Sequence, residues 1–358
     1  MLESNINYAD GLDKTEIARS IQLISKGDKQ IENKILNFFL DDVTHYIDQL
    51  HILELKITGN PNIDIQDGLN ESTYKIVENG HKLEGEIQQK LIIKEVKQIF
   101  RSILMPWFKQ SLIMKRALEK PRGYPGDYKM LELIYQNKPI SRGIGYYFDA
   151  GFLNNQLTTA VRNRKDMMGD IIRDFCNSTD LKEINILDVA SGSCREVKDI
   201  VGQLPADKKF NFVFVDQDDE ALGFSTELLG RETQNISFKF IKEDVLNFVK
   251  SDSYKKLVQE QDLIYSNGLI DYIPDRLLKV IINKLSDSLK SKGVLVLSHK
   301  DHDKYIPMRE DWLSDWRFIP RNEKSMLDLV EDVGISREGI ELRREKTEII
   351  FFMIIRKK

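Results

Sequence analysis

The stretch ILDVASGSCRE, residues 186–196, joins an apolar strand pattern that contains an acid to a loop of small residues. A strand followed by a tight glycine-containing turn and a helix start is typical of the first βα unit of a doubly wound sheet. The loop has one glycine, Gly192, where the dinucleotide-binding pattern G-x-G-x-x-G has three. Asp188 would also repel a pyrophosphate. An acid at this place favours a ligand with a cationic group and no phosphate.

The patterns on either side of this stretch predict an α/β domain preceded by helices. Strand-like segments alternate with helical ones and cover residues 184–190, 209–216, 236–244, 261–267, 293–299, 340–345 and 347–357. Upstream, helical spacing of apolar residues covers 31–56 and 86–120, with a loop predicted over 58–72. We therefore expect three regions, which are a helical cap (1–120), a connecting lid (121–152) and a doubly wound Rossmann-like domain (153–358).

The composition is that of an ordinary soluble protein, with 41% hydrophobic and 31% charged residues among 358. Lys and Arg number 53 against 57 Asp and Glu, which gives no electrostatic footprint for nucleic acid. Two cysteines and a polar, acidic start predict a cytoplasmic chain without a disulfide framework or signal peptide. The longest apolar run, 349–355, is too short for stable membrane insertion and predicts a buried strand. The long amphipathic N-terminal helices allow a homodimer, whereas their charges indicate a solvated face.

Ligands bind such sheets beyond the carboxyl ends of the strands, so we expect the site residues there. Asp216 ends the second predicted strand, and its carboxylate can accept hydrogen bonds from both ribose hydroxyls of a nucleoside. The alternative is a helix N-cap, a role that we assign to Asp218 or Asp219. After the third strand, Asp244 is placed to accept a bond from an adenine amino group, and Val245 to pack on the ring.

In order along the chain, DVASGS, Asp216, EDV and SNGLIDY resemble the class I S-adenosylmethionine-dependent methyltransferases over residues 184–298. The resemblance implies S-adenosylmethionine as the cofactor and a seven-stranded sheet whose last strand is antiparallel. We expect these cofactor-binding residues: Asp188, Ala190, Gly192, Asp216, Gln217, Asp244, Val245 and Asn267. Cys194 replaces a glycine of the commoner loop. We expect it to be a small packing residue and not a nucleophile, although a helix N-terminus lowers a thiol pKa.

Four further motifs resemble bacterial methyltransferases that make 3-hydroxy fatty acid methyl esters, which serve as extracellular signals. They are KPRGYPGDYKMLELIY (120–135), SGSCREV (191–197), GLIDYIPDRLL (268–278) and DWLSDWRFIPRNE (311–323). The resemblance implies O-methylation of a hydroxy fatty acid carboxylate. N-methylation of a small amine is the alternative within enzymes. A cofactor-binding module without turnover and a nicotinamide dehydrogenase are the alternatives outside this class.

The turn-rich segment PRGYPGDY, 121–128, has two readings. It is either a rigid turn with one Arg–Asp ion pair or a lid over the methyl group, with Tyr124 and Asp127 facing the acceptor. A carboxylate acceptor needs a cationic or hydroxyl clamp and no base, whereas an amine must first lose a proton. For the acceptor we expect binding by Arg122, Tyr128, Tyr146, Tyr147, Tyr272 and Arg317, and catalysis by Tyr124, Asp127, Asp271 and His299.

The segment LSHKDHDKY, 297–305, places His299 at a strand end, where it is either a base or a residue with a structural hydrogen bond. His302, Asp301 and Asp303 lie close in sequence, but no matching cluster occurs elsewhere, so we expect no metal site. Trp312 and Trp316, four residues apart, either close the acceptor side or pack a helix onto the core.

Overall fold

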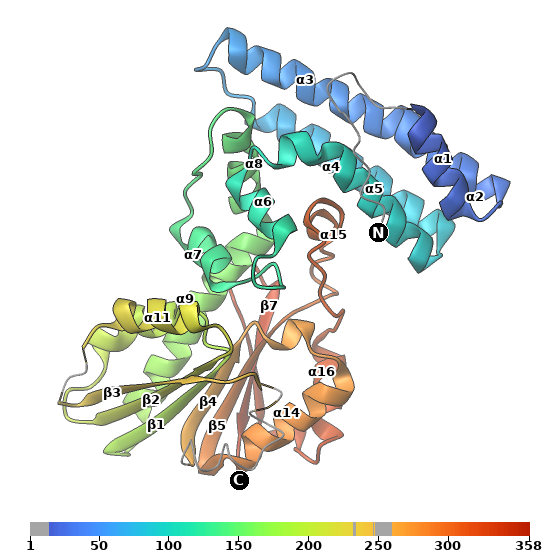
Figure 1. Ribbon diagram of the computed structural model, residues 1–358. Helices are drawn as coiled ribbons and strands as arrows, with labels where there is room; N and C mark the ends of the chain where they lie inside the picture. The colour runs from blue at the N-terminus through green and yellow to red at the C-terminus, as the bar shows by residue number, and fades with distance from the viewer. Residues whose placement is uncertain (1–13, 232–233, 246, 248–259) are drawn as a thin grey trace. The chain divides into compact units, whose positions relative to one another are not determined.

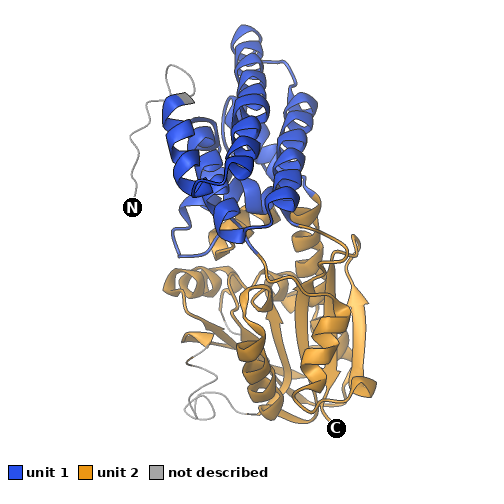
Figure 2. Ribbon diagram, turned by 90° about the vertical axis from the view of Figure 1, so that its right-hand side faces the viewer, with its two compact units in different colours: residues 1–125, 137–155, 307–317 blue, residues 126–136, 156–306, 318–358 orange. Residues whose placement is uncertain are grey.

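The computed structural model describes residues 14–231, 234–245, 247 and 260–358, which form two compact units (Figures 1 and 2). The helical unit takes the described residues up to Pro125, Asn137–Asn155 and Pro307–Arg317. The sheet unit takes Gly126–Gln136, Gln156–Ile306 and Phe318–Lys358 within the described ranges. The chain thus passes between the units repeatedly. Most of the polar start from which we expect no signal peptide, residues 1–13, lies outside the described residues.

The helical unit is built from amphipathic helices, as their apolar spacing predicts. Its helices are α1 (Lys14–Ser25), α2 (Lys29–Asn37), α3 (Thr44–Gly59), α4 (Gln66–Ile87), α5 (Lys90–Phe108), α6 (Leu112–Glu119), α8 (Ile144–Leu153) and α15 (Met308–Ser314), with a π-helical segment, η2 (Phe38–Val43), before α3. Helix α15 comes from the C-terminal half of the chain and packs against α4, α5 and α6. Its Trp312 is fully buried, with ring centroids 5.4 Å from Phe100 and 5.5 Å from Phe38.

The loop predicted over 58–72 is correct only for residues 60–65, because α3 extends to Gly59 and α4 begins at Gln66. Gly68 and Asn70 weaken the helical signal in the sequence. In the structure, one face of α4 is buried through Leu69, Thr73 and Ile76, and this packing outweighs the poor local propensity.

The sheet unit contains the seven predicted strands in one sheet, in the order β3-β2-β1-β4-β5-β7-β6. The strands are β1 (Glu183–Val189), β2 (Lys209–Asp216), β3 (Ile236–Lys242), β4 (Gln261–Asn267), β5 (Leu289–Lys300), β6 (Ile340–Arg344) and β7 (Ile350–Arg356). The first five strands pair in parallel, and β7 is antiparallel to both β5 and β6. The predicted doubly wound, seven-stranded architecture with an antiparallel last strand is confirmed.

Helices cover both faces of this sheet, because the central strands carry apolar side chains on both faces. The helices of the sheet unit are α7 (Tyr128–Gln136), α9 (Gln156–Ser178), α10 (Arg195–Ile200), η3 (Val201–Gln203), α11 (Asp219–Leu229), η4 (Ile270–Tyr272), α14 (Asp275–Asp287), α16 (Glu323–Glu331) and η5 (Arg337–Gly339). Ile184 and Ile186 of β1 pack with α9 and α10, whereas Leu187 and Val189 pack with α14 and α16. The predicted buried strand over 349–355 is confirmed, since every residue of this run is buried.

The strand order reverses between β1 and β4, which lie next to each other at the centre of the sheet (Figure 1). The loops after these strands diverge there, and this is where ligands bind in open α/β sheets. Within the described residues, no helix is both long and apolar enough to cross a lipid bilayer.

Candidate functional site

The loop after β1 keeps the backbone of a glycine-rich turn with only one glycine. Ala190, Gly192 and Cys194 have φ values of 61°, 54° and 49°, so every second residue is left-handed. A non-glycine residue in this region costs about 1–2 kcal/mol, which the surroundings must offset. The N–H groups of Ala190 and Ser191 donate to the Val215 carbonyl oxygen at 2.8 and 3.1 Å, and these bonds hold the turn against β2.

Cys194 belongs to the core cluster under α9 and α10 and is 1% exposed. Burial, with the Asp188 and Glu196 carboxyls nearby, raises the pKa of the Cys194 thiol well above its usual range. A thiol kept protonated is a poor nucleophile, so these features agree with the expected packing role.

Asp216 connects the end of β2 to this loop. Its Oδ2 accepts a hydrogen bond from the Gly192 N–H at 2.8 Å, and its Oδ1 accepts one from the Asp218 N–H at 2.9 Å. The side chain of Asp218, in turn, caps α11 by accepting from the Glu220 N–H at 2.9 Å, so the expected cap at Asp218 is confirmed. Burial raises the pKa of Asp216, although these backbone donors oppose the shift. A carboxylate oxygen has two lone pairs, so each retains one acceptor position.

Asp188 lies in the central strand β1, between Phe214 of β2 and Tyr265 of β4. It is 1% exposed, and neither carboxylate oxygen makes a well-directed hydrogen bond, although the Tyr265 hydroxyl and the Glu196 carboxyl lie near it. The buried Glu196 carboxyl of α10 accepts a bond from the Tyr265 hydroxyl at 3.1 Å. Burial, together with the Glu196 charge, raises the pKa of Asp188 well above its usual range. A buried carboxyl group without a donor is costly, and a cationic ligand would satisfy it.

The other expected cofactor residues follow the remaining strands. Gln217 is exposed directly after β2, and Asp244 and Val245 are partly buried after β3. Asp244 Oδ1 accepts from the Asn247 N–H at 3.3 Å. Asn267 ends β4, and its Oδ1 accepts a hydrogen bond from the Ser298 hydroxyl at 2.9 Å. These residues follow the ends of strands β2, β3 and β4, as expected.

After β4, Gly268 allows the guanidinium of Arg164, on α9, to approach the backbone closely. Gly268 has a φ of 101°, and a Cβ there would lie 2.5 Å from Arg164 Nη1. Arg164 is 6% exposed, its Nε has no hydrogen-bond partner, and Nη1 lies 3.8 Å from Asp271 Oδ2. A buried cation therefore lies at the point where the strand order reverses.

Asp271 and His299 lie together, as the sequence placed them after β4 and on β5. Asp271 Oδ1 accepts from the Lys300 N–H at 3.0 Å and lies 2.8 Å from His299 Nδ1. That contact is poorly directed, so neither ring nitrogen of His299 has a hydrogen-bond partner. Burial alone would raise the pKa of Asp271, but His299 and Arg164 outweigh it and lower this pKa. Asp271 is thus held as a carboxylate.

Beside this group, the ring of Tyr272 stacks on Phe318, with centroids 5.6 Å apart. Asp301, two residues after His299, forms an ion pair with Arg344 at 2.5 Å. Among the described residues, no three His, Cys, Asp or Glu side chains are grouped to hold a metal ion.

In the segment PRGYPGDY, Asp127 is 1% exposed and directly precedes α7, and its Oδ1 accepts from the Met130 N–H at 2.9 Å. Tyr128 packs on Phe224 with centroids 5.6 Å apart, and its hydroxyl lies 3.4 Å from Glu220 Oε2. Arg122 and Tyr124 are partly buried in turns of the helical unit. The segment therefore divides between the two units after Pro125.

The helical unit contains the other expected acceptor residues. Tyr146 is exposed, and its ring packs edge-on against Tyr147, with centroids 5.3 Å apart. The Tyr147 hydroxyl donates to the Ile63 carbonyl oxygen at 2.5 Å. Arg317 pairs with Asp315 at 2.9 Å. These three side chains thus have local partners within this unit.

The same unit contains both tryptophans of the DWLSDW segment. Trp312 is buried among helices, as described above, and Trp316 lies 6.3 Å from Phe152, with the rings stacked. These contacts agree with the alternative that the two tryptophans pack a helix onto the core.

Sequence reasoning missed three residues of the central site, namely Arg164, Glu196 and Tyr265. Arg164 lies on α9, before the first strand, in a helix whose charges show no functional pattern. Glu196 follows the loop after β1, and Tyr265 lies within β4. The only sign of a role for either residue was a polar side chain at a buried position.

The sheet order, the left-handed loop after β1 and the acid at the end of β2 define a class I methyltransferase, a class whose cofactor is S-adenosylmethionine. The family described as "Putative methyltransferase" matches residues 119–345, and the chain belongs to it. No curated protein matches the sequence.

Several solved structures are similar to this chain. A possible exported protein from Bordetella parapertussis has 16% identity and a TM-score of 0.49, covering 88% of this chain and 95% of that one. A duf574 family protein from Streptomyces avermitilis has 14% identity and a TM-score of 0.47, covering 64% and 97%. Magnesium protoporphyrin IX methyltransferase from Synechocystis, with bound SAH, has 13% identity and a TM-score of 0.42, covering 57% and 88%.

Proposed function

We propose that the protein transfers a methyl group from S-adenosylmethionine to the carboxylate of a hydroxy fatty acid, giving a methyl ester. The observation that carries the cofactor assignment is the pair of unsatisfied, buried Asp188 oxygens beside the left-handed loop. When bound, S-adenosylmethionine supplies an electrophilic methyl group on a sulfonium. The amino-acid part of the cofactor carries a cationic group. This group would be the partner that the Asp188 carboxylate lacks.

The remaining cofactor contacts follow from the acceptor positions that the chain leaves open. Asp216 keeps one acceptor position on each oxygen for the ribose hydroxyls, since each already accepts one backbone N–H. Asp244 and Val245, after β3, would receive the adenine amino group and ring. In this arrangement, the chain orients the donor, and catalysis comes mainly from alignment and exclusion of water.

A carboxylate acceptor is favoured because the nearby acids are already engaged. Asp127 caps α7, and the lowered pKa of Asp271 makes it a weak base. An amine acceptor must lose a proton, whereas a carboxylate is ionised at neutral pH and needs a cationic clamp. Arg164 offers such a cation, with its Nε unpartnered. Tyr124, Arg122 and the other predicted acceptor residues remain candidates for closing the site over the substrate.

N-methylation of a small amine is a second candidate, supported by one observation. Neither ring nitrogen of His299 has a hydrogen-bond partner, although Asp271 lies 2.8 Å from Nδ1. An imidazole beside a carboxylate is a suitable base for an ammonium group.

An acceptor screen with methyl-labelled cofactor tests both candidates. We expect label in the organic phase with 3-hydroxy fatty acids, and we expect mild alkali to release it as volatile methanol, because methyl esters hydrolyse and N-methyl groups do not. Label that is stable to alkali and formed with amines would support the second candidate. Cofactor binding without product from any acceptor would indicate a binding module without turnover.

Matched arginine variants on α9 test the clamp. Arg164→Met should lower turnover strongly, whereas Arg173→Met, which removes an arginine paired at the surface with Asp170, should leave it near the wild-type value. Equal rates for both variants would remove Arg164 from the acceptor and cofactor site.

A further inference from the structure

We propose that helix α7 forms a wall of the cofactor site. Leu131 covers the amino-acid part of S-adenosylmethionine over the loop after β1, and Glu132 holds the helix in place. This inference deepens the proposed function, because it rests on the assignment of that loop to the cofactor. Helix α7 belongs to the sheet unit and comes from the motif KPRGYPGDYKMLELIY, residues 120–135.

The loop after β1 is open on one side, at Gly192. The Gly192 N–H donates to Asp216 Oδ2, and its carbonyl oxygen accepts from the Ser225 hydroxyl at 2.9 Å, so both backbone groups are engaged. Apart from its chain neighbours, a Cβ at Gly192 would lie within 4 Å of only one atom of the described residues, which is Leu131 Cδ1 at 4.0 Å. A ligand that lies over the loop at Gly192 would therefore contact the Leu131 side chain.

Helix α7 is fixed to the helices that surround this loop. Its Tyr128 ring packs on Phe224 of α11, with centroids 5.6 Å apart. Arg162 Nη1, on α9, donates to the Ile134 carbonyl oxygen at 3.4 Å. Packing on two neighbouring helices thus sets the position of Leu131. The buried side chains of α7 are Tyr128, Met130, Glu132 and Ile134.

An ion pair connects α7 directly to the end of the loop. Glu132 is 6% exposed, its Oε1 accepts from Arg195 Nε at 3.2 Å, and its Oε2 pairs with Arg195 Nη2. Arg195 is the first residue of α10 and follows Cys194, the last left-handed residue of the loop. A two-point contact between a carboxylate and a guanidinium fixes orientation as well as distance. Glu132 is therefore a positioning residue, which acts on the cofactor through the place of α7.

Leu131 supplies an apolar surface where binding and reaction both benefit from one. The amino-acid part of the cofactor carries a hydrocarbon chain up to the sulfonium, and covering this chain removes apolar area from water. Exclusion of water also lowers the local dielectric, which strengthens the attraction between the cationic group of the ligand and Asp188.

Hydrogen exchange on the full chain, with and without saturating S-adenosylmethionine, tests the wall. Backbone amides of residues 128–136 should exchange more slowly when the cofactor is bound, because the ligand contacts and stabilises α7. Helix α16 packs with Leu187 and Val189, on the face of β1 away from α9 and α10, and is the internal control that should change little. Unchanged exchange over α7 at saturation would overturn the proposal.

Leu131→Ala should weaken S-adenosylmethionine binding roughly tenfold in titration calorimetry, because it removes apolar contact area on the ligand. Leu133→Ala is the matched control. Both leucines are partly buried on α7, but they lie about 200° apart around the helix, so this variant should bind as the wild type does. Wild-type affinity in Leu131→Ala, or equal losses in the two variants, would refute the placement of Leu131.

Glu132→Gln removes the charge of the pair and keeps its shape. A loosened α7 lowers the fraction of molecules with the wall in place, so the apparent affinity for S-adenosylmethionine should fall by at least about threefold. Glu132→Asp keeps the charge and should recover most of this loss.

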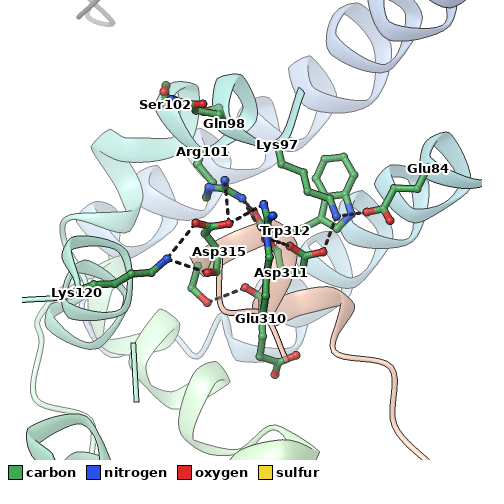
Figure 3. Close-up of polar contacts among 12 residues, drawn as sticks. Glu84, Lys97, Gln98, Arg101, Ser102, Lys120, Glu310, Asp311, Trp312 and Asp315 are labelled. Carbon is green, nitrogen blue, oxygen red and sulfur yellow. Dashed lines mark hydrogen bonds and ion pairs between the residues drawn. The ribbon is translucent and has the colours of Figure 1, made fainter. Parts of the chain in front are cut away.

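Glu84→Gln is the matched control for Glu132→Gln. Glu84 pairs with Lys97 in the helical unit (Figure 3), and the two ion pairs are similarly buried. This control should leave the affinity for S-adenosylmethionine unchanged, and the midpoint of thermal unfolding checks that both variants are folded. Equal affinities in Glu132→Gln and Glu84→Gln, or no recovery in Glu132→Asp, would remove the positioning role.

These measurements separate a failure of the wall from a failure of the proposed function. A wild-type protein that does not bind S-adenosylmethionine would contradict both, since the cofactor assignment itself would be wrong. Binding by the wild type, with unchanged exchange over α7 and wild-type affinity in Leu131→Ala, would contradict only the wall. No methyl acceptor is needed, so failure of the labelled-cofactor screen would leave these results standing.

Discussion

Replacing Asp271 with asparagine separates a structural role of this residue from a catalytic one. Asparagine keeps the shape and can still accept the Lys300 N–H, so the change removes mainly the negative charge. That charge is 3.8 Å from the Arg164 guanidinium, and both side chains are more than nine-tenths buried. Removing one partner of a buried ion pair costs about 3–5 kcal/mol, because the other charge stays buried and unpaired.

Such a loss should lower the midpoint of thermal unfolding by roughly 6–20 °C, at about 2–4 °C per kcal/mol for a unit of this size. Circular dichroism during heating measures it on the full chain. Asp332→Asn is the matched control, because Asp332 pairs with Lys279 at the surface and the pair should contribute at most about 1 kcal/mol. The double variant Asp271→Asn with Arg164→Met should be less destabilised than the sum of the single changes.

The direction of the pKa shift of Asp271 determines how this stability difference varies with pH. The folded-state pKa of Asp271 is lowered from the ordinary value of 3.8, so its contribution is fully present above that value. It should disappear only as the pH falls further, through the lowered pKa. The difference between wild type and Asp271→Asn should therefore stay constant from neutral pH to about pH 5. An unchanged midpoint with abolished turnover would refute the structural reasoning and make Asp271 a catalytic group.

The other predictions concern the cofactor, the turn segment and the helical unit. Asp216→Ala should weaken S-adenosylmethionine binding by about 1.5–3 kcal/mol for each lost bond, measured by calorimetry, and unchanged affinity would remove the ribose assignment. Tyr124→Phe should reduce turnover much more than cofactor affinity; equal losses, or none, would argue against a lid. Gly80→Ala should destabilise the protein by about 1–3 kcal/mol in urea unfolding, because its Cβ would lie 2.7 Å from the Trp312 ring, whereas Gly85→Ala, with open space around it, should not.

The sheet was predictable because its central strands are buried on both faces and read as continuous apolar runs. The predicted bounds of β2 and β4 agree with the structure residue for residue. Helix α4 was harder, since its glycines and asparagine favour turns and only tertiary packing makes it helical. The strands could therefore be predicted from local sequence patterns, whereas this helix depends on long-range contacts that the local sequence does not show.

The candidate site was predictable where it follows strand ends and unpredictable where it depends on distant segments. Asp188 and Asp216 were predicted as site residues from their places at or near strand ends and from the resemblance to a methyltransferase family. The left-handed φ of Ala190 and Cys194 has no residue signature, since L-amino acids other than glycine rarely adopt it. Arg164 reaches Gly268 only through the fold, because the two are more than a hundred positions apart.

The interleaving of the two units has a consequence for how such a protein changes over generations. Helix α15, with its fully buried Trp312, is encoded between β5 and α16, yet it completes the core of the helical unit. A protein made from the N-terminal helices alone would therefore lack part of its hydrophobic core. A protein made from the C-terminal part alone would carry Trp312 without the helices that bury it. Recombination at either boundary would damage both products, so these two units are expected to be inherited together and not exchanged as separate cassettes.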